Sequence, residues 1–390
     1  TGRPAGDGRV VVTAPPAPMG PVGPGRGEPS GGAVPSRTRP VTPARPRIVL
    51  NALPLDARGG GVSTYIHELL DALVGEVDAE LIAAVRPGGR SELPDGVTAR
   101  VARESRGVAR ALTGAFGFGP ADLFHGLDVD LPLRGSAPTV STVHDLAIFD
   151  APWAFPRSRV AGERVLVRHA LRRADVIVAV SAFTAERVSA LVGRTAVVVH
   201  SAPGRDMVPA SAEAVDRARS FYRLPERFVL HVGNIEPRKD LATLAEACRR
   251  AGVPLVLTGH GLWGHRAPEG VLEIGHVPAS DLPPLYGAAT LVGYASRYEG
   301  FGLPPVEAMA CGAAVVSTPV PSVVEVVGDG VATFRPGDVE GLTVTVADLL
   351  ADDSRRSELA RRGAQRVKAL SWEITARGTA EAYRSLGLAV

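Results

Sequence analysis

The sequence has few lysines, few cysteines and no long apolar run. Lys239 and Lys368 are its only lysines, and the 43 basic residues nearly balance 41 acidic ones. A net charge of +2 gives no support to a nucleic-acid partner, because such partners select strongly basic surfaces. No segment approaches the roughly 18 apolar residues of a membrane-spanning helix, and residues 1–46 lack the apolar core of a signal peptide.

Cys248 and Cys311 are the only cysteines, and both fall in segments with helical spacing. A single disulfide bond between them is the alternative to two free thiols. Two cysteines cannot build a disulfide scaffold, and their neighbours do not suggest a metal site. We therefore expect a globular protein of the reducing cytoplasm.

The length and the order of apolar segments indicate two domains. A chain of 390 residues exceeds what one hydrophobic core usually supports. Residues 1–46 are rich in proline, glycine and arginine, so we expect a disordered tail. Later, short apolar runs alternate with helical segments, which is typical of α/β domains with a parallel sheet. We predict two Rossmann-like β/α/β domains, residues 47–203 and 204–370. The expected strands include residues 47–51, 81–85, 122–125, 139–143, 175–180 and 196–200, then 227–232, 254–258, 272–277 and 290–295.

The stretch from Tyr298 to Gly312 reads as a strand end, a glycine loop and a short helix. Pro304 and Pro305 suit the first helical turn. The carboxylates of Glu299 and Glu307 would then lie at the carboxyl edge of the sheet, where ligands bind. Together with unpaired backbone amides they suit a polyol phosphate. The alternative is two solvated acids that favour a helix start for dipole reasons.

This stretch resembles the E-x7-E signature of family-four retaining glycosyltransferases of the GT-B fold. The resemblance implies that Glu299 contacts hydroxyls of the donor sugar and that Glu307 contacts the nucleotide ribose. It covers roughly residue 47 to the end, and it implies two Rossmann-like domains that face each other across a cleft. Residues 371–390 would form a helix that crosses back to the first domain. The donor-binding loop between the two glutamates would be Gly300, Phe301, Gly302 and Leu303.

A second glycine loop, residues 59–61, follows the first expected strand. Unsubstituted backbone at a helix start can approach a phosphate. The spacing lacks the G-x-G-x-x-G fingerprint, which disfavours a dehydrogenase. Taken alone, such a turn is usually only a turn, but the resemblance implies that Gly60 and Gly61 lie against the donor diphosphate.

His144 and Asp145 follow the strand expected at residues 139–143. Such a pair could form an acid/base couple or orient a ligand, although a histidine at a strand end is often only structural. The resemblance implies that His144 faces the donor sugar and helps to position it, with Asp145 nearby.

Arg238 and Lys239 stand directly before an expected helix that Asp240 can cap. Two cations at a helix start oppose its dipole, and an anionic ligand would resolve the conflict. An exposed basic pair is the alternative. The segment from Gly233 resembles the family's diphosphate-binding motif, which implies that both cations neutralise charge on the departing nucleoside diphosphate.

No metal ion or other cofactor is expected. Asp128 and Asp130 form a D-x-D that would hold a divalent metal in another glycosyltransferase fold, but a GT-B enzyme does not require one. His260 and His276 have no further ligands at metal-binding spacing.

An arginine-rich segment, residues 101–112, could form a basic amphipathic helix for lipid or an anionic acceptor. An ordinary solvated face is the alternative. Weak peripheral contact with the inner face of a membrane is therefore a minor expectation.

We predict a retaining, metal-independent hexosyltransferase of polysaccharide biosynthesis. Its donor would be a nucleotide-diphosphate sugar of the GDP-mannose or UDP-sugar type. Its acceptor would be a glycan, lipid-linked or small-molecule hydroxyl. The alternatives are a GT-B nucleotide-sugar epimerase or hydrolase, and a nucleotide-sugar-binding module without catalysis.

Overall fold

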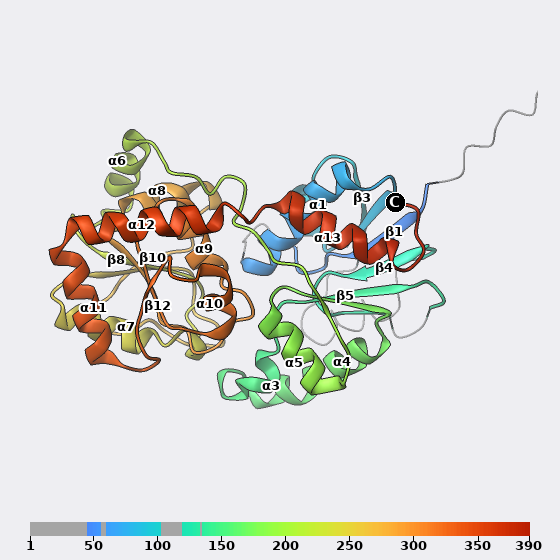
Figure 1. The fold of residues 1–390 in the computed structure, drawn as a ribbon, viewed down its shortest axis with the longest axis horizontal. Coiled ribbons are helices and arrows are strands. Elements are labelled where there is room, and N and C mark those ends of the chain that lie inside the picture. Colours follow the sequence, from blue (N-terminus) through green and yellow to red (C-terminus); the bar gives the residue numbers. More distant parts are fainter. Residues whose placement is uncertain (1–44, 56–59, 103–118, 133–134) are drawn as a thin grey trace, which may run out of the picture. The chain divides into compact units, whose positions relative to one another are not determined.

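The computed structural model describes residues 45–55, 60–102, 119–132 and 135–390. The tail expected at residues 1–46 lies outside this part of the chain except for its last two residues. Residues 45–390 form one compact unit that contains two fully parallel sheets (Figure 1). We call the part with the first sheet the N-lobe and the part with the second the C-lobe. The predicted α/β class with two Rossmann-like parts is confirmed.

The N-lobe contains a seven-stranded sheet in the order β3-β2-β1-β4-β5-β6-β7. Its strands are β1 (Arg47–Asn51), β2 (Glu80–Val85), β3 (Val97–Val101), β4 (Leu123–Gly126), β5 (Thr139–Val143), β6 (Val176–Ala179) and β7 (Val197–Val198). Its helices are α1 (Gly61–Glu76), η1 (Pro87–Glu92), α3 (Ala147–Asp150), η2 (Pro152–Ala154), α4 (Arg157–Arg173) and α5 (Ala182–Val192).

The edge strand β3 was not predicted. Its side chains are only partly buried, so it lacks the apolar run that marks β1 and β5. Val101, expected to begin the basic helix, is instead the last residue of β3. Most of that expected helix, residues 103–112, lies outside the described residues.

The C-lobe contains a six-stranded sheet in the order β10-β9-β8-β11-β12-β13. Its strands are β8 (Val229–Val232), β9 (Leu255–Thr258), β10 (Leu272–Gly275), β11 (Leu291–Tyr294), β12 (Val315–Ser317) and β13 (Ala332–Thr333). Its helices are α6 (Ala212–Phe221), η3 (Pro237–Lys239), α7 (Leu241–Arg250), η4 (Ala279–Asp281), α8 (Leu282–Ala288), α9 (Leu303–Ala310), α10 (Pro321–Val327), α11 (Val339–Ala351) and α12 (Asp353–Val367). Chain order reverses between β8 and β11, the point of a parallel sheet beside which ligands bind.

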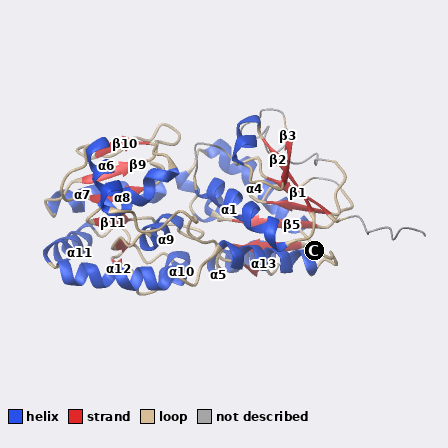
Figure 2. Cartoon of the chain, turned by 90° about the horizontal axis from the view of Figure 1, so that it is seen from above, coloured by secondary structure: helices blue, strands red, loops and turns tan. Residues whose placement is uncertain are grey.

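Helices cover both faces of the two sheets (Figure 2). In β1, Ile48 and Leu50 pack into the same cluster as α1, whereas Val49 packs on the opposite face with α4 and α5. Burial on both faces explains why these strands are continuous apolar runs rather than alternating ones. Within the described ranges no helix has the length and apolarity needed to span a membrane.

The last helix, α13 (Trp372–Arg384), packs against α1 of the N-lobe. The buried indole of Trp372 donates its Nε1 hydrogen to the carbonyl of Pro203 at 2.9 Å. Thr375 donates to the carbonyl of His200 at 2.7 Å. These bonds fix the end of the chain to the segment that links the two lobes.

Candidate active site

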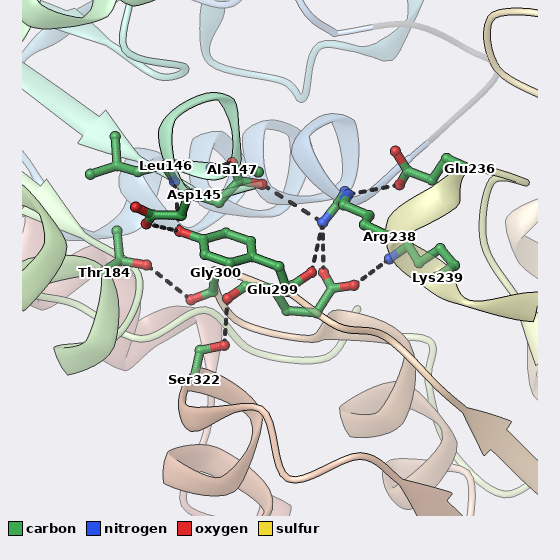
Figure 3. A network of polar contacts seen from close by, with 12 residues as sticks. Asp145, Leu146, Ala147, Thr184, Glu236, Arg238, Lys239, Glu299, Gly300 and Ser322 are labelled. Atoms are coloured by element: carbon green, nitrogen blue, oxygen red, sulfur yellow. Dashed lines mark hydrogen bonds and ion pairs between the residues drawn. The ribbon is translucent and has the colours of Figure 1, made fainter. Parts of the chain in front are cut away.

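Glu299 lies at the centre of a charged cluster between the lobes (Figure 3). Its side chain is buried, with Oε1 2.6 Å from Nζ of Lys239 and Oε2 3.1 Å from Nη1 of Arg238. Burial acts to raise the pKa of this carboxyl, but the charges of Lys239 and Arg238 more than offset it and lower the pKa to about 2. Glu299 is therefore an anion at neutral pH.

Arg238 and Lys239 reach this position from η3, which follows β8. They are not an exposed basic pair, since Lys239 is buried and Arg238 has three carboxylates nearby. Nε of Arg238 lies 2.9 Å from Glu236, and Nη1 lies 3.9 Å from Asp145 of the N-lobe. Burial acts to lower the pKa of Arg238, but Glu299, Asp145 and Glu236 raise it. Arg238 therefore reaches toward the N-lobe, whereas Nζ of Lys239 contacts Glu299 and Tyr294 of its own lobe.

The prediction that the side chain of Asp240 caps the following helix is wrong. Asp240 occupies the N-cap of α7 but makes no side-chain bond to that helix. Its φ of 47° places it in the left-handed region, and its carboxylate pairs with Arg297 at 2.8 Å instead.

The Gly300 loop touches the N-lobe through its backbone. A β-carbon built on Gly300 would lie 1.7 Å from the carbonyl oxygen of His144 and 2.7 Å from Cβ of Asp145. Gly302, with φ of 96°, is the N-cap of α9. Glycine is therefore required at position 300 by close approach and at position 302 by backbone conformation.

Serine and threonine hydroxyls hold this loop, and the sequence did not reveal them. The carbonyl of Gly300 accepts hydrogen bonds from Ser181 at 2.6 Å and Thr184 at 3.2 Å, both in the N-lobe. The carbonyl of Glu299 accepts from Ser322 at 2.6 Å. Ser181 also caps α5, so its sequence signal is an ordinary helix cap and says nothing of the second lobe.

A carboxylate of the C-lobe also caps a helix of the N-lobe. Glu325 accepts hydrogen bonds from the amides of Ala182 at 2.7 Å and Phe183 at 3.1 Å, at the start of α5. Its Oε1 lies 2.7 Å from Nε2 of His200, in the segment between the lobes. The contact joins residues more than 140 positions apart in the sequence.

His144 and Asp145 do not form a bonded pair. Nε2 of His144 donates to the carbonyl of Leu127 at 2.8 Å, which leaves Nδ1 as the ring nitrogen able to accept a hydrogen bond. Asp145 accepts from the amide of Ala147 at 2.9 Å and faces Arg238. This geometry favours ligand orientation over an acid/base couple.

The Gly60–Gly61 backbone lies beside the loop that carries Gly300. Gly60 has φ of 116° and precedes α1 without a side-chain cap. A β-carbon on Gly61 would touch Cδ1 of Leu303 at 3.4 Å. Phe301 is buried, with its ring centroid 6.2 Å from that of His200. Leu303 thus borders the Gly60–Gly61 backbone, whereas Phe301 packs toward the linking segment.

Glu307 has an environment unlike that of Glu299. It is the fifth residue of α9, in the second turn, and its buried carboxyl accepts a bond from Tyr286 at 3.2 Å. Burial raises its pKa to about 7, with a further contribution from the charge of Glu68. Glu307 therefore changes charge near neutral pH.

The remaining candidates lie in tight turns. Gly233, with φ of 145°, directly follows β8, and a β-carbon on Gly259 would fall 2.1 Å from the carbonyl oxygen of Gly233. Asp128 and Asp130 form a turn after β4, closed by a backbone bond of 2.6 Å. Among the residues that the structure describes, no three acidic, histidine or cysteine side chains gather as a metal site.

Sequence comparison places both lobes in known families. The family described as "Glycosyltransferase Family 4" matches residues 59–203, and "Glycosyl transferases group 1" matches residues 214–366. The O-antigen chain mannosyltransferase B of Escherichia coli is 34% identical over 284 residues, which are 68% of this chain and 74% of that protein. The chain belongs to the family-four, group 1 glycosyltransferases of the GT-B fold.

Other relatives of this glycosyltransferase differ in name and extent. The D-inositol 3-phosphate glycosyltransferase of Kineococcus radiotolerans is 30% identical over 311 residues, 70% of this chain and 69% of that protein. The serotype-specific mannosyltransferase WbdA of Escherichia coli is 31% identical, but the match spans only 28% of its length.

Solved structures show the same fold at low sequence identity. Sucrose-phosphate synthase from Thermosynechococcus elongatus superposes with a TM-score of 0.73 at 22% identity, covering 89% of this chain and all of that one. HepE from Anabaena, in complex with UDP and glucose, gives 0.69 at 18% identity, covering 87% and 100%.

Proposed function

We propose that this glycosyltransferase moves a hexose from a nucleotide-diphosphate sugar to an acceptor hydroxyl with retention of anomeric configuration. The observation that carries the proposal is the buried contact of Glu299 with Arg238 and Lys239, in which Arg238 also lies 3.9 Å from Asp145 of the other lobe. The two cations would bind the diphosphate. Glu299 would accept hydrogen bonds from hydroxyls of the transferred sugar.

The reaction needs no enzyme nucleophile in this scheme. The bond between the anomeric carbon and the phosphate oxygen breaks, and the acceptor oxygen bonds to the same face of that carbon. The acceptor proton passes to the departing phosphate oxygen. Arg238 and Lys239 stabilise the negative charge that develops there, which is usually the largest catalytic contribution. Contact between the lobes excludes water and limits hydrolysis.

The donor is proposed to be of the GDP-mannose or UDP-sugar type, with its ribose on Glu307 and its diphosphate between η3 and Gly60–Gly61. The mannosyltransferase name of a relative supports the first type. The UDP complex of a protein with the same fold supports the second. The acceptor is proposed to be a polyhydroxylated glycan, lipid-linked sugar or small molecule, bound mainly by the N-lobe, in keeping with the names of the relatives.

Transfer is proposed to be independent of metal, because Arg238 and Lys239 can supply the positive charge that a divalent cation supplies elsewhere. The expected outcome is an unchanged rate in excess EDTA. A rate that falls with EDTA and returns with magnesium would direct attention to Asp128 and Asp130.

We also propose that the protein acts in the cytoplasm and makes weak contact with an anionic membrane surface. Both cysteines are buried and free. Helix α4 carries six arginines and one glutamate, a composition that attracts anionic lipid. Co-sedimentation with phosphatidylglycerol vesicles, but not with phosphatidylcholine vesicles, is expected at low salt. Equal recovery with both would remove this part of the proposal.

The function is tested by incubating the protein with GDP-mannose or UDP-glucose, with and without mannose oligosaccharides. The expected result is release of nucleoside diphosphate that requires the acceptor, with retained configuration in the proton NMR spectrum of the product. Release without an acceptor would instead indicate a hydrolase, and a changed donor sugar would indicate an epimerase. Donor binding without turnover would indicate a binding module.

A further inference from the structure

Two aromatic rings and one arginine meet where the lobes face each other. The ring centroids of Phe155, from the N-lobe, and Trp263, from the C-lobe, are 5.5 Å apart. The guanidinium carbon of Arg159, in the first turn of α4, lies 5.3 Å from the Phe155 centroid and 5.2 Å from the Trp263 centroid. We call these three residues the aromatic cluster.

The aromatic cluster lies on the ligand-binding side of both sheets. Phe155 belongs to the segment that leaves β5 through His144 and passes η2. Trp263 lies in the loop after β9, the neighbour of β8. Helix η2 packs against η3, which carries Arg238 and Lys239. The cluster therefore borders the site proposed for the diphosphate, and both lobes contribute to it.

Trp263 is unusual in both exposure and backbone conformation. It is 40% exposed, and its φ of 53° is rare for a bulky residue. Neighbouring backbone bonds hold the loop, including Leu262 N to the carbonyl of Ile235 at 3.1 Å. An exposed indole adds little to a hydrophobic core, so core packing does not explain this strained backbone conformation. Such strain gathers at sites that bind ligands.

Arg159 is oriented for hydrogen bonding as well as for packing. Its Nε and Nη2 donate to the two carboxylate oxygens of Glu163 at 2.6 and 3.0 Å. The arginine side chain is 44% exposed and that of Glu163 is 30% exposed. The cluster thus combines apolar ring faces with a fixed, accessible pair of hydrogen-bonding groups. A pyranose has matching chemistry, because C–H groups cover one face and hydroxyls surround the edge.

We propose that the aromatic cluster is a subsite for a sugar ring of the acceptor. This inference rests on the transfer function proposed above. A nucleobase could also stack on these rings, but the strand order β9-β8-β11 places the loop of Trp263 and the helix of Glu307 on opposite sides of β8. Since Glu307 is the proposed ribose ligand, the base would lie away from Trp263. The N-lobe origin of Phe155 and Arg159 also favours the acceptor.

The kinetic test uses the full chain with Trp263→Ala, Phe155→Ala and the conservative Trp263→Phe. Loss of one aromatic contact should raise the acceptor KM by about threefold to tenfold. The donor KM and the calorimetric affinity for the nucleoside diphosphate should not change, and Trp263→Phe should restore most of the loss. Phe221→Ala is the matched control, because Phe221 is 78% exposed on α6 and lies outside the cluster.

Two kinetic outcomes would overturn the subsite. A weaker nucleoside-diphosphate affinity with an unchanged acceptor KM would assign the cluster to the base. A lower kcat with both KM values unchanged would reduce it to a contact that closes the lobes.

Direct binding separates this inference from the proposed function. Mannose, glucose and inositol oligosaccharides are titrated while tryptophan fluorescence is followed in the wild type and in Trp263→Phe. A saturable change present only in the wild type would support the subsite even if no sugar is transferred. Absence of that change with every oligosaccharide would overturn the subsite while leaving transfer to be judged by turnover.

Discussion

Gly300 and His144 meet so closely that no side chain fits between them. A β-carbon on Gly300 would lie 1.7 Å from the carbonyl oxygen of His144, a separation at which atoms must move. Because the obstacle is backbone, a rotamer change cannot relieve it. The contact joins the loop that carries Glu299 to the segment that carries Asp145.

We therefore expect Gly300→Ala to separate the lobes. The misplacement should lower kcat by about 10²-fold. The melting temperature should fall as well, because one buried apolar cluster includes both Leu50 of the N-lobe and Leu230 of the C-lobe. Gly75→Ala is the control, since a β-carbon there meets nothing within 4 Å and alanine favours a helix. A Gly300→Ala variant with wild-type kcat would show that this closed contact does not form during turnover.

Lys239→Ala should weaken nucleoside-diphosphate binding and lower kcat. The change removes a charge 2.6 Å from Glu299 and leaves that carboxylate buried beside Arg238 alone. Loss of one preorganised charge typically lowers kcat by about 10²–10³-fold. Lys368→Ala, the other lysine and an exposed one, is the control. Wild-type affinity in Lys239→Ala, measured by calorimetry, would remove Lys239 from the diphosphate site.

Much of the fold was predictable because both faces of its strands are buried. Strands β1 and β5 have the predicted bounds, since apolar runs reflect burial directly. Strand β3 was missed because an edge strand needs fewer apolar residues. The αL backbone of Asp240 was also missed, because an aspartate before a helix is ordinarily its cap.

Only part of the candidate site could be predicted from the sequence. Motifs could identify Glu299, Arg238 and Lys239 as candidates, but not the direct contact among them. Ser181 and Thr184 bind Gly300 from more than 110 residues away in sequence. Such pairs arise from how two lobes meet, and Ser181 alone has the sequence pattern of an ordinary helix cap.

Nucleotide affinity should rise with pH around neutrality. The pKa of Glu307 is raised to about 7 by burial, so its carboxyl gains charge as pH increases from 6 to 8. If the ribose hydroxyls donate to the ionised form, affinity increases over the same window. The affinity also depends on pH because the phosphate of the nucleotide titrates. Glu307→Gln should remove the part of the pH dependence that comes from Glu307 and leave the part that comes from the phosphate. An identical slope in wild type and Glu307→Gln, followed by calorimetry, would separate Glu307 from the ribose.

The same raised pKa fixes the sign of a stability effect. The folded protein holds the proton of Glu307 more tightly than the unfolded chain does, because the pKa is about 7 instead of the usual 4.5. This contribution to stability is fully present below pH 4.5 and is lost as the pH rises through about 7. In the absence of nucleotide, Glu307→Gln should therefore be more stable than the wild type at pH 8. The difference should disappear near pH 4, as measured by urea unfolding.

A buried chain of hydrogen bonds connects α13 to the sheet beneath His144. Nδ1 of His125 lies 2.7 Å from the hydroxyl of Tyr383, and Nε2 lies 2.8 Å from Oγ1 of Thr142. Burial, with a smaller contribution from the nearby charge of His144, lowers the pKa of His125 to about 3. His125 is therefore neutral, and it uses one ring nitrogen for each partner.

Tyr383→Phe should destabilise the protein by about 1–3 kcal/mol, because it leaves a buried nitrogen of His125 without its partner. A histidine whose folded pKa is depressed contributes stability above its usual 6.5 and loses it as pH falls toward 3. His125→Gln should accordingly weaken the acid sensitivity of unfolding in that window. Tyr222→Phe is the control for losing a hydroxyl at a half-buried site, and a smaller loss is expected there. If Tyr383→Phe unfolds at the same urea concentration as the wild type, the bond to His125 does not anchor α13. The packing of α13 against α1 would then be sufficient to hold the helix in place.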